Sequence, residues 1–128
     1  MAKNTVDADA IYKLGKDTIK KLDDMHVKIG NIKKAIDRMA EGDGTMAYWS
    51  GERALEWYAA SYKNVANSYN RVAKIADAMR VEILYGIDSY NKDKDDTSKA
   101  KLNTLKGQFI HLRDQAKNEA KKIATAGV

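Results

Sequence analysis

No proline occurs anywhere in the 128 residues. Proline removes a backbone hydrogen-bond donor and clashes with the preceding helical turn, so it breaks helices and marks loops. Its absence from a chain of this length favours a few long helices joined by short connections. The length itself corresponds to a single small domain.

Cysteine is also absent, which excludes disulfide bridges, thiolate metal ligands and cysteine nucleophiles. The first residues, Met1–Asn4, lead into charged side chains and not into an apolar run. No stretch approaches the roughly 18 apolar residues that a membrane span needs. We therefore expect a protein that is made in the cytoplasm without a cleaved signal peptide. Any export route would have to accept a substrate without such a peptide.

Apolar or small side chains recur at alternating steps of four and three over residues 11–39, the period of a helix with one apolar face. The glycines at Gly42 and Gly44 then permit left-handed backbone and end the helix. We expect this helix to cover about residues 6–40. Its apolar stripe consists of Ile11, Gly15, Thr18, Leu22, Met25, Ile29, Ile32, Ile36 and Met39.

A second helix is expected over about residues 50–90, with Ser50 as its N-cap and Glu52 in its first turn. The same three-and-four spacing runs through Leu55, Tyr58, Tyr62, Val65, Tyr69, Val72, Ala76, Met79, Ile83 and Tyr90, a set that we call the second-helix stripe. Ala59, Ala66 and Ala73 lie beside it at intervals of seven, which makes the apolar face three positions wide. Small side chains there would let a partner helix approach closely.

Two long helices with a short connection fold back as an antiparallel hairpin, which covers only one side of so wide a stripe. Each exposed aliphatic side chain forfeits about 1.5–3 kcal/mol of burial. A second copy, another protein or a third helix would supply the missing cover. We predict self-association into a dimeric four-helix bundle through Leu55, Tyr58, Tyr62, Val65, Tyr69, Val72, Met79 and Ile83.

After a polar break at residues 91–96, Thr97 or Ser98 is expected to cap a third helix over 97–128. Its apolar face would hold Leu102, Leu105, Phe109, Leu112, Ala116 and Ile123. Residues 1–96 carry equal numbers of basic and acidic side chains, so the net charge of +5 belongs to this third segment. Its basic residues are Lys99, Lys101, Lys106, Arg113, Lys117, Lys121 and Lys122.

This basic segment is open to several interpretations. Packing of its apolar face on the bundle with the lysines in water is favoured over contact with an anionic membrane, an acidic partner or nucleic acid. Because the charge asymmetry is confined to it, we predict that residues 90–128 form a docking segment. On this hypothesis the hairpin of residues 1–96 stays folded without residues 97–128.

An enzyme is not expected, because no catalytic triad, phosphate loop or pair of buried carboxylates can be assembled. No cofactor or metal is expected either. His111 and Asp114 share a helix face, but two ligands do not make a closed zinc site. Residues 93–96 lack the glycine and the closing glutamate of a calcium loop. The tyrosines of the second-helix stripe lie at core spacing, which favours packing over base stacking.

The connection between the two long helices reads MAYWSGERA, with Trp49 and Gly51 in a W-x-G arrangement. A Trp-x-Gly between two amphipathic helices resembles the signature of the WXG-motif (ESAT-like) family. That resemblance implies small helical hairpins that pair as homodimers or heterodimers and leave the cell through the type VII (ESX) machine. It also implies recognition by the membrane ATPase of that machine, and for some members the chaperoning of larger co-secreted effectors.

The family's export signal, a tyrosine followed four residues later by an acid, is out of register here. Tyr90 has Asp93 at three and Asp95 at five, with Lys94 between them. This favours an export signal supplied by a partner. The small partners of larger LXG-type toxins have similar hairpins, so a role as such an adaptor is an alternative. A basic helical protein that binds membrane or nucleic acid through residues 97–128 is another.

Overall fold

The computed structural model describes residues 8–42, 48–90 and 96–126. These residues form three α-helices and no strand, as the sequence predicts: α1 (Ala8–Glu41), α2 (Glu52–Tyr90) and α3 (Asp96–Ala126). The helix limits lie within two residues of the expected ones. The third helix begins at Asp96, so Thr97 and Ser98 are inside it and do not cap it.

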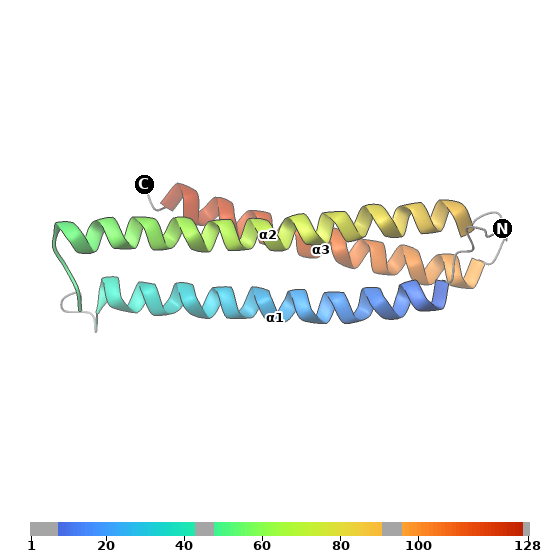
Figure 1. Cartoon of the computed structure of the whole chain (residues 1–128), viewed down its shortest axis with the longest axis horizontal. Coiled ribbons are helices and arrows are strands. Elements are labelled where there is room, and N and C mark those ends of the chain that lie inside the picture. Colours follow the sequence, from blue (N-terminus) through green and yellow to red (C-terminus); the bar gives the residue numbers. More distant parts are fainter. Residues whose placement is uncertain (1–7, 43–47, 91–95, 127–128) are drawn as a thin grey trace, which may run out of the picture.

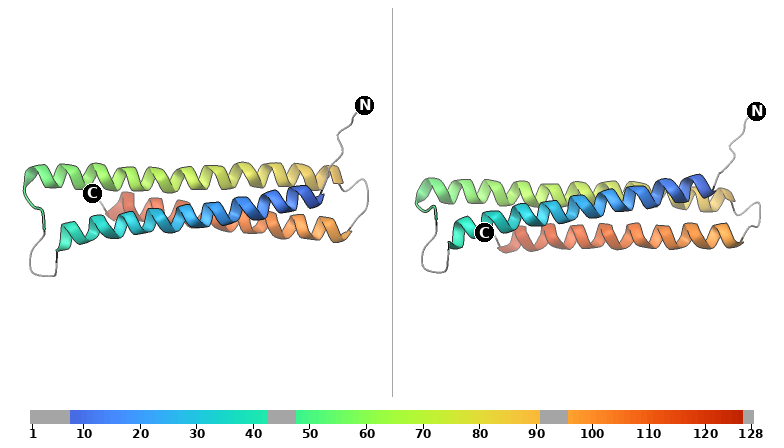
Figure 2. Two further views of the ribbon diagram at one scale, coloured as in Figure 1. Left: turned by 60° about the horizontal axis from the view of Figure 1, so that its bottom comes forward. Right: turned by 90° about the horizontal axis from the view of Figure 1, so that it is seen from below.

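The three helices lie side by side as an elongated bundle (Figure 1). α2 runs antiparallel to α1, and α3 returns along α2 in the same direction as α1 (Figures 1 and 2). α3 ends before it reaches the Glu52 end of α2. The α1–α2 hairpin is therefore covered by a third helix over most of its length but not at the end where its two helices are joined.

α3 is part of the core. It packs more extensively on α2 than α1 does. Its apolar face is buried, with Leu102, Leu105 and Phe109 fully enclosed. The cover that the wide second-helix stripe requires thus comes from the same chain.

α1 buries only part of its predicted stripe. Leu22, Ile29 and Ile36 are buried, whereas Met25 and Ile32 of the same stripe are 40% and 55% exposed. The difference arises because α2 and α3 both lie against one side of α1. An alternating three-and-four spacing fills two adjacent lines on a helix. One line faces this contact throughout, and the other packs on the core only near its ends, at Ile11 and Met39.

A close approach between α1 and α3 occurs at Gly15. A β-carbon placed there would overlap a methyl carbon of Leu105. The glycine, which weakens the isolated helix by about 1 kcal/mol relative to alanine, is what allows the buried Leu105 side chain to pack against the α1 backbone.

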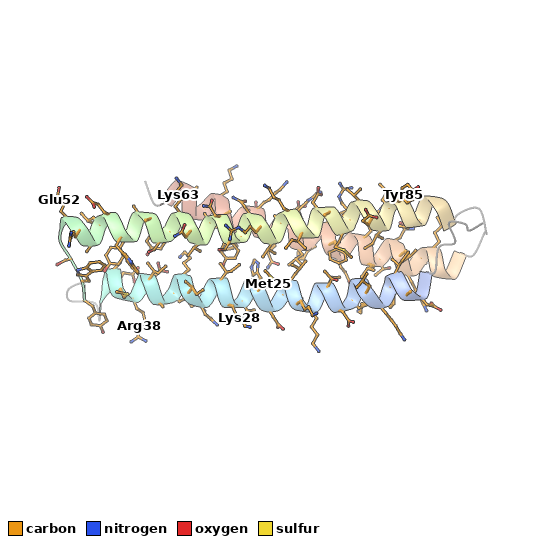
Figure 3. The ribbon with its side chains drawn as sticks, viewed as in Figure 1. Met25, Lys28, Arg38, Glu52, Lys63 and Tyr85 are labelled. Carbon is orange, nitrogen blue, oxygen red and sulfur yellow. The ribbon has the colours of Figure 1, made fainter. Side chains whose placement is uncertain are left out.

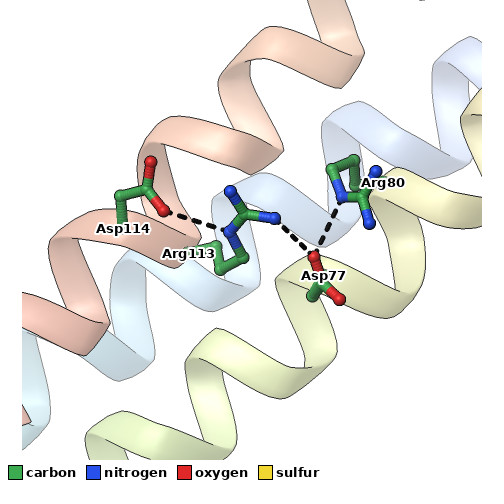
Figure 4. A network of polar contacts seen from close by, with 4 residues as sticks. All are labelled: Asp77, Arg80, Arg113 and Asp114. Atoms are coloured by element: carbon green, nitrogen blue, oxygen red, sulfur yellow. Dashed lines mark hydrogen bonds and ion pairs between the residues drawn. The ribbon is translucent and has the colours of Figure 1, made fainter.

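A polar network links α2 to α3 near the middle of the molecule (Figure 4). The Asp77 Oδ1 atom accepts hydrogen bonds from Arg113 Nη1 of α3 at 2.6 Å and from Arg80 Nε at 2.9 Å. Arg113 Nε also donates to Asp114 at 3.1 Å. The two arginine contacts hold the pKa of the Asp77 carboxyl below its ordinary value. Bonds of this kind fix the register of the two helices.

Candidate functional site at the W-x-G junction

Gly51 begins α2. The Leu55 amide donates to the Gly51 carbonyl at 3.0 Å, which is the first helical hydrogen bond. Gly51 therefore occupies the N-cap position, and the prediction that Ser50 does so is wrong by one residue. The Gly51 backbone has a φ of 110°, a conformation that other residues rarely adopt. The glycine of the W-x-G pattern is thus required by the backbone of the turn.

The junction is also tied to the end of α1. The Gly42 amide, at a φ of 69°, donates to the Arg38 carbonyl at 2.7 Å. The Tyr48 amide donates to the Met39 carbonyl at 3.1 Å. Free carbonyls at the last turn of a helix need such donors. Tyr48 therefore lies against the last turn of α1.

Trp49, Trp57 and Tyr58 form a group that we call the junction cluster. The Trp49 ring lies 5.5 Å from the Trp57 ring and 5.9 Å from the Tyr58 ring, and the latter two are 5.5 Å apart. All three pairs are tilted or edge-on, the favoured geometry for aromatic side chains. The Tyr58 hydroxyl donates to the Trp49 carbonyl at 2.7 Å. The cluster joins the turn to the first two turns of α2.

The junction cluster is buried on one side only. Tyr58 is buried, whereas Trp49 and Trp57 are 38% and 40% exposed. Tyr48 and Leu55, which lie nearby in the chain, are also exposed. α3 does not reach this end of the molecule, so the two indole rings face water. Trp49 is therefore both a packing residue and an available contact for a partner.

The second-helix stripe lies mostly inside the single chain. Tyr58, Val65, Tyr69, Val72 and Ile83 are buried, Tyr62 and Met79 are half-buried, and Leu55 is largely exposed. The residues predicted to face a second copy are thus already covered by α1 and α3. A dimer formed through them would require α3 to leave its place.

The residues of the predicted export signal carry little structural information. Tyr90 is the last residue of α2, and Asp93 and Asp95 lie outside the described residues.

Among the basic residues of α3, the largest structural role belongs to Arg113, through its bonds to Asp77 and Asp114. Lys101 lies over the Tyr12 ring of α1 at 5.9 Å, and Lys122 pairs with Glu119 at 3.6 Å. The other basic residues of this helix are Lys99, Lys106, Lys117 and Lys121.

One polar contact between α1 and α2 escaped the sequence analysis. The Tyr62 hydroxyl donates to Asp37 at 2.5 Å, and Lys33 binds the other carboxylate oxygen at 2.9 Å. Burial and the neighbouring carboxylate raise the pKa of Tyr62 well above its ordinary value. Burial alone would raise the pKa of Asp37, but the bonds from Tyr62 and Lys33 lower it. The stripe position of Tyr62 indicated packing and gave no sign of this bond.

The other candidate polar groups lie apart from the junction. The His26 ring packs on the Tyr69 ring at 5.0 Å, and its Nδ1 atom is buried without a hydrogen-bond partner. His111 and Asp114 lie on α3, where Asp114 is bound to Arg113. In the described part of the chain, no three side chains of metal-binding type are grouped closely enough to share an ion.

Comparison of the chain with protein-family models, curated proteins and solved structures finds no match. The resemblance to the WXG-motif family therefore rests on the junction residues and the helical hairpin. None of the described helices is long and apolar enough to cross a membrane.

Proposed function

We propose that this chain is a non-enzymatic helical binding protein of the type VII (ESX) secretion pathway. It would act as a substrate, a co-substrate or a targeting adaptor. The adaptor role includes that of a small partner protein for a larger LXG-type effector. The observation that carries the proposal is the pair of half-exposed tryptophans, Trp49 and Trp57, held at the W-x-G turn on the end of the bundle that α3 leaves uncovered. Tryptophan is among the residues most enriched in the energetic centres of protein interfaces.

The proposed partners are a related helical hairpin, a larger co-secreted effector and the membrane ATPase of the export machine. In this proposal the junction cluster is the contact surface, and the second-helix stripe serves the chain's own core. The alternative of membrane binding through the apolar face of α3 is less well supported, because that face is buried against α2. Insertion would first have to detach the helix.

Export is the decisive test. The chain would be expressed in a bacterium with a type VII machine, and its amount in the medium compared with that in a strain lacking the membrane ATPase. We expect export that depends on the ATPase and falls at least severalfold in Trp57→Ala, with an unchanged melting temperature. Trp57→Ala is preferred to Trp49→Ala because Trp57 lies within α2 and Trp49 lies in the turn itself. Release that is equal with and without the ATPase would contradict the proposal.

A further inference from the structure

A groove runs between α2 and α3 on the side away from α1. A cavity of about 650 Å³ lies between Ala59, Ala66 and Asn70 of α2 and Ala120, Ile123 and Ala124 of α3. A second cavity of about 580 Å³ continues it past Ala73 to Asp77. The two share Asn67, Asn70 and Lys117 in their walls, and no residue of α1 lines either. Together they form one groove.

The walls of this groove are basic. The first cavity is lined by Lys63, Lys117 and Lys121, and the second adds Arg71 and Lys74. Lys63 points away from α1 (Figure 3). Asp77 is the one acidic residue among the described residues that line the groove, and it already binds Arg80 and Arg113. The groove therefore favours an occupant of negative charge.

The floor of the groove is apolar. Alanines of both helices form it, and the α2 side spans residues 59–77, or about 27 Å at 1.5 Å per residue. The distance between packed helices depends on the side chains at the contact, so small side chains along the floor allow a third helix to lie close. A length of 27 Å corresponds to an α-helix of about 18 residues.

We propose that this groove binds an acidic amphipathic helix of another protein, which completes a four-helix bundle with α1, α2 and α3. Glutamates or aspartates on the flanks of that helix would face the lysines, and its small apolar face would lie on the alanines. Single-stranded nucleic acid binds by stacking on aromatic side chains, and Tyr62 is the one aromatic residue in the lining. The groove is separate from the junction cluster, and the proposal does not depend on export.

The test uses the full chain and a fluorescent 18-residue peptide with an alanine and leucine stripe flanked by glutamates. A peptide with lysines in place of the glutamates is the ligand control. We expect anisotropy to show binding of the glutamate peptide alone, which weakens as salt rises because exposed charges are screened. The triple variant Lys63→Glu, Lys74→Glu and Lys117→Glu should bind about tenfold less tightly, since exposed ion pairs are each worth up to about fivefold.

A matched variant reverses three exposed lysines of α1, Lys20, Lys28 and Lys34, with the same change in net charge. It should bind as the unaltered chain does. Asn70→Trp places a large side chain in the groove and should abolish binding without altering charge. On the unaltered chain, amide shifts on adding peptide should be confined to residues 59–77 and 113–124. Equal loss in both lysine variants, no binding of the glutamate peptide, or tighter binding of a single-stranded oligonucleotide at the same residues would overturn the proposal.

Discussion

Two glycines of this chain stand where a side chain would disturb the structure, for different reasons. Gly51 has a backbone conformation that a β-carbon disfavours, with open space around it. Gly15 has ordinary helical backbone, but the Leu105 side chain occupies the space of its missing β-carbon. The first could be expected from the W-x-G pattern. The second could not, because the sequence does not state which helix lies opposite Gly15.

Substitution of Gly15 by alanine is expected to destabilise the fold, and Gly107→Ala is the matched control. Both gain about 1 kcal/mol of helix propensity. At Gly15 the gain is outweighed by overpacking against the buried Leu105, which typically costs about 1–3 kcal/mol. No atom lies within 4 Å of a β-carbon at Gly107. In urea unfolding, Gly107→Ala should be more stable than the parent and Gly15→Ala less stable. The opposite order would show that α3 does not approach α1 here.

Alkaline pH is expected to destabilise the fold through Tyr62. Burial and Asp37 raise its pKa in the folded chain above the ordinary value of 10.0. The unfolded chain therefore releases this proton first, so the stability contributed by Tyr62 is present below pH 10 and is lost as pH rises beyond it. Tyr62→Phe should cost about 1 kcal/mol at neutral pH and lose less stability than the parent between pH 9 and 11. Tyr85 is exposed, so Tyr85→Phe should have the same free energy of unfolding as the parent in denaturant titrations at pH 9 and at pH 11.

At the scale of elements, the structure agrees with the favoured interpretation of α3, whose apolar face packs on the bundle. The spacing of Leu102, Leu105 and Phe109 predicted an apolar face on this helix, and the structure has that face in the core. Periodicity identifies which face of a helix is apolar and will be buried. It does not identify the element against which that face packs. The positive charge of the segment suggested a separable docking element. The charge lies on the outward side of a helix whose other side is buried.

Removal of α3 is therefore expected to unfold the protein. A chain that ends at Asp96 would expose the side of α2 that faces α3. It would also lose the large buried side chains of α3. Single changes such as Phe109→Ala typically cost about 3–5 kcal/mol, which approaches the whole stability of a small domain. Circular dichroism should show reduced helicity and no cooperative melting transition. A truncated chain that melts cooperatively near the parent's temperature would restore the hypothesis of an independent hairpin.

At the scale of the whole molecule, the third helix buries the part of the apolar stripe on α2 that a two-helix hairpin would leave exposed. The wide stripe on α2 led to the prediction of a dimer because the sequence does not specify whether cover comes from the same chain. The length and order of the helices, the W-x-G junction and the absence of a strand were predictable, since each depends on local patterns. The Asp77–Arg113 pair and the α2–α3 groove were not, because they depend on the register between helices.

The isolated chain is expected to be a monomer at micromolar concentration. From Tyr58 to Ile83 its second-helix stripe is covered internally, and Leu55 is exposed. Multi-angle light scattering should give a mass close to 14.3 kDa. A mass of twice that value that persists on dilution would mean that exposed residues such as Ile32 and Val81, and not the stripe, form a second interface.

The packing of α3 on α2 also has a consequence for synthesis. α1 leaves the ribosome first, yet it makes fewer contacts with the other helices than α2 and α3 make with each other. Three of the five largest fully buried side chains, Phe109, Leu102 and Leu105, belong to the helix that is translated last of the three. Domains generally fold as units, so the nascent chain has to expose the apolar faces of α1 and α2 until α3 emerges. During that interval the two completed helices are available to chaperones or to a waiting partner.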